Sequence, residues 1–451
     1  MKQRIAEALS MTVGQKAPRF ALAQRAWSVL AGPVTAALVL SRTTEVEQGY
    51  YYAFLSFASF VMFFELGFGN IVVQWLAHSW SSTAQADGSL GARVHGPETQ
   101  SLIAIARYWY FGAGLAFVAF AVPAAGWWLN SDAEPWNKWL PAWSLFALGT
   151  GANLALAGRV TVAEGLGEVE LVYRVRLLAS LGGTIALWGA LVAGFGYYAI
   201  ALQQAAVFAV TWTTMRTLQR EFLRSATGSF DALLRFWRSE LLPLQWRSTL
   251  VVGSGFLLYQ TSTLIAFRVL GPGEAGRLGF VMSIASMISS LGLMLIGVNS
   301  VRLGRLAGAR EWKQFSHDFR KQLFVGLGIA VVAIGAADVA LVLGERVGVF
   351  AADRLAPQSV MALIFATCLV VIVVQAYTIR ARCLKQEPFA LENCGAALLW
   401  PAVAFWTASR FGTLGMAIAY LGLTIVATAI PVLFRTMRSE ARWRAALDAA
   451  S

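Results

Sequence analysis

Long apolar stretches are the feature that most constrains this chain. Twelve of them, each of about 20 residues or more, follow one another along the 451 residues. A helix of about that length crosses the hydrocarbon core of a membrane. Hydrophobic residues make up 57% of the sequence and charged residues only 13%, roughly half the charge of a soluble domain. The predicted spans are 22–42, 50–77, 102–129, 139–159, 171–194, 196–216, 246–268, 277–301, 322–344, 357–379, 388–408 and 412–434.

The distribution of Lys and Arg predicts the orientation of these spans. Basic residues stay on the cytoplasmic side of a membrane. With both termini inside, 29 of the 36 fall in cytoplasmic segments or inner helix ends. The same distribution accounts for the net charge of +12 without a nucleic-acid partner. We therefore predict an all-α integral membrane protein with twelve transmembrane helices and cytoplasmic N and C termini.

One pattern of residues occurs twice in the sequence, 227 residues apart. Glu47, Gly49 and the run from Ser56 to Ser59 recur as Glu274, Gly276 and the run from Ser283 to Ser286. Small residues also recur in helices by chance, but both copies lie where one apolar stretch ends and the next begins. The pattern predicts two parallel six-helix lobes around a central cavity, an architecture typical of transporters.

The predicted lobes are 1–216 and 246–451, the second including a cytoplasmic tail. In the joint between them, 217–245, apolar residues recur at intervals of three and four, which predicts an amphipathic helix on the cytoplasmic membrane surface. That apolar face consists of Phe230, Leu233, Leu234, Trp237 and Leu241. The segment 79–100 is rich in Ser, Gly, Ala and Gln. We interpret it as a mobile cytoplasmic loop, more readily a tolerated insertion than a functional element.

Catalytic and metal-binding features are absent from the sequence. There is no phosphate-binding Gly-Lys-Ser/Thr signature, and the outer loops are too short to hold a catalytic domain. The three histidines lack the spacing of a metal site, and Cys368, Cys383 and Cys394 are too few for a disulfide framework. We expect a non-enzymatic protein without a metal or other cofactor.

Tryptophans cluster around the turn between the third and fourth spans. This turn is predicted to lie on the outer side, where indole rings are enriched at headgroup depth. We interpret the cluster as a membrane anchor rather than a ligand cage. Its members are Trp127, Trp128, Trp136, Trp139 and Trp143.

Two opposite charges lie inside the second and third predicted spans. A charged side chain in the hydrocarbon costs about 2.5–3.5 kcal/mol on insertion scales, so it faces protein or water. Glu65 lies in the inner half of the second span, and Arg107 lies near the inner end of the third. Either the two form an ion pair, or Glu65 contacts the transported species or a coupling proton.

Five further arginines lie near cytoplasmic helix ends and are candidates for a basic cavity: Arg25, Arg174, Arg176, Arg247 and Arg302. Arg174 and Arg176 are two residues apart, so they point in nearly opposite directions on a helix and at least one extends to headgroups. Arg25 and Arg247 occupy similar places at the starts of the two lobes. They line a cytoplasm-facing cavity if both face the seam, and are simple positive-inside anchors otherwise.

Polar and acidic residues within the spans complete the candidate set. Asn70 and Asn299 are nearly equivalent in the two lobes, and Gln260 lies in the seventh span. These amides are candidates for substrate contact, although bonding between neighbouring helices is the simpler interpretation. Asp338 and Glu392 lie near interfaces and are, with Glu65, candidates for coupling to an ion gradient.

The sequence resembles the polysaccharide (Wzx-type O-antigen) flippases of the multidrug/oligosaccharidyl-lipid/polysaccharide exporter superfamily. The resemblance is closest over 25–77, in Arg25-Ala-Trp, Gly32-Pro33, the run from Glu47 to Tyr50 and the run from Glu65 to Gly69. Glu274 to Gly276 repeats part of it. Length and hydropathy extend the similarity over the whole chain, whereas the segment 79–100 departs from it and leaves open a contact with a synthase partner.

The resemblance implies export of an undecaprenyl-diphosphate-linked oligosaccharide from the cytoplasmic to the outer leaflet of a bacterial inner membrane, for polysaccharide, O-antigen or lipopolysaccharide synthesis. A proton or sodium gradient would drive it. Three alternatives remain. They are a drug/cation antiporter of the same superfamily, a lipid II flippase, for whose two extra helices the chain has no room, and a non-transporting glycan-assembly subunit.

Overall fold

The computed structural model describes residues 16–81, 97–216, 256–258, 260–384 and 390–436. The chain divides into two compact units, Met1–Gly253 and Ser254–Ser451. The predicted amphipathic joint, 217–245, lies outside the described residues, as does most of the predicted loop 79–100. The boundaries predicted for the lobes therefore stay predictions.

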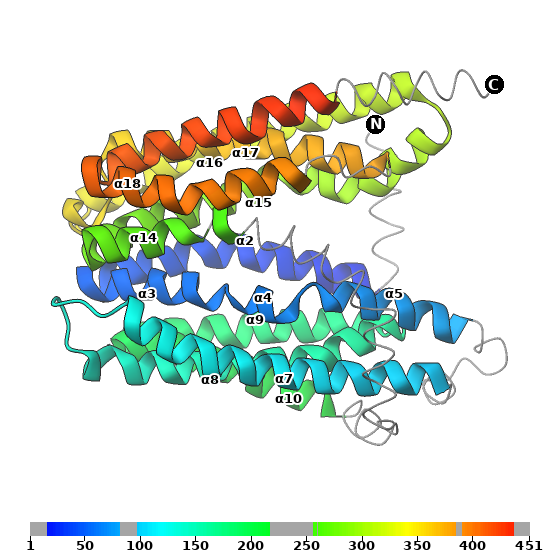
Figure 1. Ribbon diagram of the computed structural model, residues 1–451, viewed down its shortest axis with the longest axis horizontal. Coiled ribbons are helices and arrows are strands. Elements are labelled where there is room, and N and C mark those ends of the chain that lie inside the picture. The colour runs from blue at the N-terminus through cyan, green and yellow to red at the C-terminus, as the bar shows by residue number, and fades with distance from the viewer. Residues whose placement is uncertain (1–15, 82–96, 217–255, 259, 385–389, 437–451) are drawn as a thin grey trace. The chain divides into compact units, whose positions relative to one another are not determined.

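The first unit consists of helices (Figure 1). They are α2 (Lys16–Arg42), α3 (Glu45–Ala58), α4 (Val61–Glu65), α5 (Phe68–Ser81), α7 (Pro97–Trp128), α8 (Trp136–Gly165), α9 (Val169–Val192), the short 3-10 helix η1 (Gly196–Tyr198) and α10 (Ala199–Thr214). α8 packs against α5, α7 and α10, and α9 packs against α2 and α10.

The second unit is built in the same way. It contains α14 (Thr261–Leu270), α15 (Pro272–Gly308), α16 (Trp312–Arg346), the 3-10 helix η3 (Ala352–Arg354), α17 (Gln358–Cys383), α18 (Ala390–Leu423) and the π-helical turn η4 (Thr424–Ala429). α15 packs against α16 and α17, and α18 packs against α14.

The exposed helix faces are those of a protein in a bilayer. Seven helices among the described residues are long and apolar enough to cross a membrane. The most apolar window of α16 has a mean hydropathy of 2.3, yet only 17% of it is buried inside the protein. Phe324 and Val332 of this helix are 69% and 72% exposed. A soluble protein would not leave so continuous an apolar surface in water, and the all-α membrane fold is confirmed.

The predicted second span, 50–77, is not one helix. The chain turns at Ser59 and Phe60, and a second break follows at Leu66 and Gly67, which have φ angles of 55° and 66°. A left-handed residue cannot continue a right-handed helix, and for a leucine this conformation is unfavourable. The prediction of a continuous helix was therefore wrong, because hydropathy reports apolar character and not backbone conformation.

The last two predicted spans meet at Gly412. The apolar stretch Cys394–Thr436 has 43 residues, about 65 Å if it were one straight helix, twice the thickness of a bilayer core. Gly412 has a φ of 64° and a ψ of −158°, a conformation open to glycine, and it divides α18. Figure 1 shows the orange and red parts of this segment running side by side in opposite directions. The exact count of twelve spans stays a prediction, since most of the predicted seventh span is not described.

The repeated sequence pattern marks helix beginnings. Glu47 accepts a hydrogen bond from the backbone N–H of Thr44, while Thr44 Oγ1 accepts one from the N–H of Glu47, a capping box that starts α3. Glu274 lies in the first turn of α15, where its charge favours the helix dipole, and it pairs with Arg277 at 2.6 Å. Both glutamates thus stabilise a helix N-terminus.

The tryptophan cluster is only partly a surface feature. Trp127 and Trp136 are 69% and 64% exposed, as expected for membrane anchors. Trp139 and Trp143 are fully buried and pack with Tyr50 and Phe54, and the Trp143 indole donates to the Ala121 carbonyl. For these two residues the anchor interpretation was wrong, because they lie on the face of α8 that packs inside the unit.

An equivalent hydrogen bond joins the first and fifth helices of each unit. The Trp188 indole of α9 donates to Thr35 Oγ1 of α2 at 2.8 Å, and the Trp400 indole of α18 donates to Ser262 Oγ of α14 at 3.1 Å. Thr35 and Ser262 are 227 residues apart, the interval of the sequence repeat. The two halves therefore share a packing contact as well as a sequence pattern.

Replacing Ser262 by Ala will lower the free energy of unfolding by about 1–2 kcal/mol, because the fully buried Trp400 indole loses its acceptor. Ser262→Thr, which keeps a hydroxyl, will recover most of the loss. Unfolding of the purified protein in mixed micelles measures the effect. The control is Ser290→Ala, at an exposed serine that bonds only its own helix; equal stability of Ser262→Ala and Ser290→Ala contradicts the prediction.

Candidate functional site

The break between α4 and α5 exposes backbone groups that a continuous helix would satisfy. α4 ends at Glu65, and α5 starts at Phe68. The last carbonyls of a helix and the first N–H groups of the next one lack intrahelical partners. The Trp109 indole of α7 donates to the Glu65 carbonyl at 3.4 Å. A neighbouring helix thus compensates for the break.

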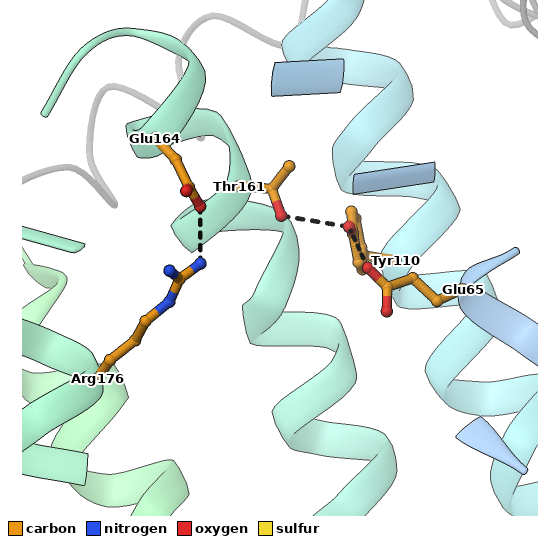
Figure 2. Close-up of polar contacts among 5 residues, drawn as sticks. All are labelled: Glu65, Tyr110, Thr161, Glu164 and Arg176. Atoms are coloured by element: carbon orange, nitrogen blue, oxygen red, sulfur yellow. Dashed lines mark hydrogen bonds and ion pairs between the residues drawn. The ribbon is translucent and has the colours of Figure 1, made fainter. Parts of the chain in front are cut away.

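The Glu65 carboxylate is held by a tyrosine. Tyr110 Oη donates to Glu65 Oε1 at 3.0 Å and lies 3.2 Å from Thr161 Oγ1 of α8 (Figure 2). Tyr110 is fully buried. A charged group with a hydrogen bond from a neutral donor is stabilised by about 1.5–3 kcal/mol. The contact joins three helices, α4, α7 and α8, at one point.

The predicted ion pair between Glu65 and Arg107 is not formed. Arg107 is half-buried, and its guanidinium lies 5.6 Å from the ring centroid of Tyr108. Arg107 and Tyr110 are three residues apart on α7, so they start from similar faces, but the shorter tyrosine reaches the carboxylate. The alternative, in which Glu65 contacts a transported species or a proton, stays a prediction.

Two glycines make room for this contact. A Cβ on Gly69 would lie 2.8 Å from Tyr110 Oη and 2.9 Å from Glu65 Oε1. A Cβ on Gly158 would lie 2.9 Å from Cδ2 of the Tyr110 ring. Real Cβ contacts are not so short, so any larger side chain would displace the tyrosine. The glycines therefore fix the position of Tyr110 between α5 and α8.

Arg176 of α9 forms an ion pair with Glu164 of α8, with Nη2 and Oε2 2.7 Å apart (Figure 2). Its side chain is 39% exposed and that of Glu164 is 31% exposed. Arg174, two residues earlier, is exposed. Arg176 is thus paired with an acid of its own unit, whereas no described acid forms an ion pair with Arg174.

Arg302 of α15 forms an ion pair with Asp318 of α16, with Nη2 and Oδ2 2.6 Å apart. Gln314 donates to the other carboxylate oxygen at 3.0 Å. Asp318 is buried, and it was not among the candidates from the sequence. The signal that could have identified it is the spacing of four residues from Gln314, which places both side chains on one helix face.

Two further arginines were missed. The Arg159 guanidinium of α8 lies 4.7 Å from the Trp212 ring of α10. The Arg380 guanidinium of α17, only 6% exposed, lies 4.6 Å from the Phe319 ring and 5.2 Å from the Phe315 ring, both of α16. Aromatic faces stabilise a cation, and more strongly where water is excluded. Both arginines had been counted only as positive-inside charges.

Four of the remaining candidates lie on α2, α15 and α16 or directly before α14. Arg25 is exposed on α2, Gln260 is half-buried before α14, and Asp338 is half-buried on α16. Asn299 donates to the Leu295 carbonyl of its own helix at 2.9 Å. The simpler interpretation from the sequence was a bond to a neighbouring helix. The side chains of Asn70 and Glu392, and the whole of Arg247, lie outside the described residues. In the part of the chain that the structure describes, no three metal-binding side chains group together.

Comparisons of the sequence with protein-family models and with curated proteins find no match. Solved structures do match over nearly the whole chain. One is an inward-facing multidrug resistance MATE family transporter of the MOP superfamily, with a TM-score of 0.62, 13% identity and coverage of 92% of this chain and 95% of that one. The lipid II flippase MurJ, in an inward closed conformation, matches with a TM-score of 0.62, 12% identity and coverage of 93% and 87%.

A eukaryotic MATE transporter, AtDTX14, matches with a TM-score of 0.56, 15% identity and coverage of 94% and 95%. This chain shares the fold of these three solved structures. The similarity covers both units, and the structures that carry it are those of transporters and a flippase rather than of enzymes. At these identities the likeness establishes the fold and leaves the cargo open.

Replacing Gly69 by Ala will lower the free energy of unfolding by about 1–3 kcal/mol, because the added Cβ overlaps the Glu65–Tyr110 hydrogen bond. Gly112→Ala is the matched control: no atom lies within 4 Å of its Cβ position, and alanine favours the helix. Unfolding in mixed micelles distinguishes the two. A Gly69→Ala protein as stable as Gly112→Ala contradicts the described packing.

Proposed function

We propose that this transporter fold flips an undecaprenyl-diphosphate-linked oligosaccharide from the cytoplasmic to the outer leaflet by alternating access. The location would be a bacterial inner membrane, with both termini cytoplasmic, in the synthesis of a polysaccharide such as O-antigen. The cargo and membrane lipids are the expected partners, together with other polysaccharide-assembly proteins. No cofactor is required besides an ion gradient.

The charge balance of the described helices carries this proposal. Glu164 and Asp318 are neutralised by arginines of the same unit, and Glu65 is bonded to Tyr110. No described acid forms an ion pair with Arg25, Arg107 or Arg174. With the predicted orientation, these three arginines would leave an excess of positive charge at the cytoplasmic ends of their helices. A diphosphate matches that excess, whereas a cationic drug would be repelled by it.

The candidate residues divide into three roles. Guanidinium groups of Arg25, Arg107, Arg174 and Arg247 would bind phosphate oxygens, since Arg presents paired donors to such groups. The amides of Asn70, Gln260 and Asn299 would contact sugar hydroxyls. Arg176 and Arg302 would join them only if their pairs with Glu164 and Asp318 opened. Glu65, Asp338 and Glu392 are the acids available for coupling to protons or sodium.

A drug/cation antiporter is the second candidate function. Two MATE transporters are among the similar folds, and Glu65 is an acid inside the membrane-spanning part of the unit. This alternative predicts that the protein lowers the accumulation of a cationic dye in cells, and that Glu65→Gln abolishes the effect. The flippase proposal predicts unchanged dye accumulation for both proteins.

Arg107→Ala will reduce translocation of lipid-linked glycan by about tenfold or more, because a charge-assisted bond to phosphate contributes about 1.5–3 kcal/mol. Leaflet-resolved detection of the glycan, in cells lacking the native gene and expressing each variant at equal levels, measures it. The control is Arg346→Ala, at an exposed arginine that is the last residue of α16. If deleting the whole gene leaves the glycan in its normal leaflet, the flippase proposal is wrong.

A further inference from the structure

The broken helix of the first unit has a continuous counterpart in the second. By the repeat interval of 227 residues, Gly292 is the sequence equivalent of Glu65, and Leu293 is the equivalent of Leu66. α15 is helical from Pro272 to Gly308 through this position. A Cβ on Gly292 would lie 3.3 Å from the Gly326 carbonyl of α16. The acid and the break thus occur together in one unit, and the second unit has neither at the equivalent place.

The Glu65 carboxylate lies at the N-terminus of the helix that follows the break. Gly69 is in the first turn of α5, and its Cβ position is 2.9 Å from Glu65 Oε1. The first N–H groups of α5 lack intrahelical partners, and the helix dipole is positive at this end. A negative charge on Glu65 therefore stabilises a helix that starts here. It stabilises the break itself.

The direction of the hydrogen bonds is fixed while Glu65 is ionised. A carboxylate only accepts, so Tyr110 must donate its one hydroxyl hydrogen to Glu65, and Thr161 must donate to Tyr110. A helical threonine has another acceptor available, the carbonyl four residues earlier. Thr35 and Thr150 of this unit donate in that way.

We propose that Glu65 is a proton-binding site that controls whether α4 and α5 are separate or continuous. A proton from water forms an O–H bond on the carboxylate, and that hydroxyl donates to Tyr110. Tyr110 then donates to Thr161, whose hydroxyl turns to the Ala157 carbonyl. One proton is gained and no other group changes charge. Without the anion at its N-terminus, α5 joins α4 and the helix becomes continuous, as α15 is.

The charged surroundings leave this role to Glu65. α4 and α5 pack against α7 and α8. From α7, Arg107 lies one turn before Tyr110; from α8 come Arg159 and Glu164. Glu164 acts on Tyr110 only through its charge, and its carboxylate is bonded to Arg176. Among the described side chains of these helices, Glu65 is the acid that touches the Tyr110 hydroxyl.

The inference deepens the proposed function, since it makes the proton the coupling ion, but its test needs no cargo. Amide hydrogen exchange of the purified full chain in nanodiscs is followed by mass spectrometry between about pH 5 and 8, with correction for intrinsic rates. Residues 67–70 are expected to exchange about tenfold more slowly at the acidic end, where their N–H groups enter the continuous helix. Glu65→Gln will show the slow exchange at every pH.

Two further variants make the result specific. Tyr110→Phe removes the donor that holds the Glu65 carboxylate beside the start of α5, so the difference in exchange between acidic and neutral pH will shrink. Glu164→Gln removes a nearby acid that does not touch Glu65, and will keep the wild-type step. Exchange that is independent of pH in the wild type, or a wild-type step in Glu65→Gln, overturns the proposal. Either result leaves the leaflet assay of glycan flipping unaffected, so the two proposals fail separately.

Discussion

The structure depends on one constraint: a polar group inside the hydrocarbon needs a partner within the protein. Long helices satisfy almost all of the backbone. Where a helix breaks, at Leu66 and Gly67, side chains of α7 supply partners: the Trp109 indole bonds the Glu65 carbonyl, and the Tyr110 hydroxyl bonds the Glu65 carboxylate. The same constraint explains why the half-buried Trp188 indole and the buried Trp400 indole bond hydroxyl groups.

This constraint also explains which features could be predicted from the sequence. Apolar stretches of the required length predict helices, and the all-helical membrane fold followed from them directly. The turn at Gly412 was expected between two such stretches. The breaks at Ser59 and Leu66 were not, because both lie inside an apolar run, and the one at Leu66 is compensated by a bond from another helix. The glycine pair Gly67 and Gly69 was the available signal.

Side-chain partners were harder to predict than helices. Glu65 stood out because an acid in the membrane is costly, but its partner depends on which face of α7 packs against α4. The choice between Arg107 and Tyr110, three residues apart, cannot be made from spacing alone. The burial of Trp139, Asp318 and Arg380 likewise follows from helix packing and not from composition. What the sequence did identify were the residue types for which partners are obligatory.

The two units are alike in the contact between their first and fifth helices and differ at the position of Glu65. A transporter needs both qualities: two similar bodies that can move as wholes, and a local group that makes their states unequal in energy. In the function proposed here, the arginines would supply affinity for an anionic cargo, and Glu65 would supply a site for a driving ion. Together they form a coherent account of proton-driven export of a lipid-linked glycan.

The most direct measurement of that account is translocation in proteoliposomes that contain only this protein. An undecaprenyl-diphosphate oligosaccharide with a fluorescent sugar is incorporated in both leaflets, and a membrane-impermeant reductant quenches the label that it can reach. We expect the reductant to reach the label of both leaflets when the protein is present, and faster under a proton gradient. Quenching of the outer leaflet alone, with or without the gradient, would contradict the account.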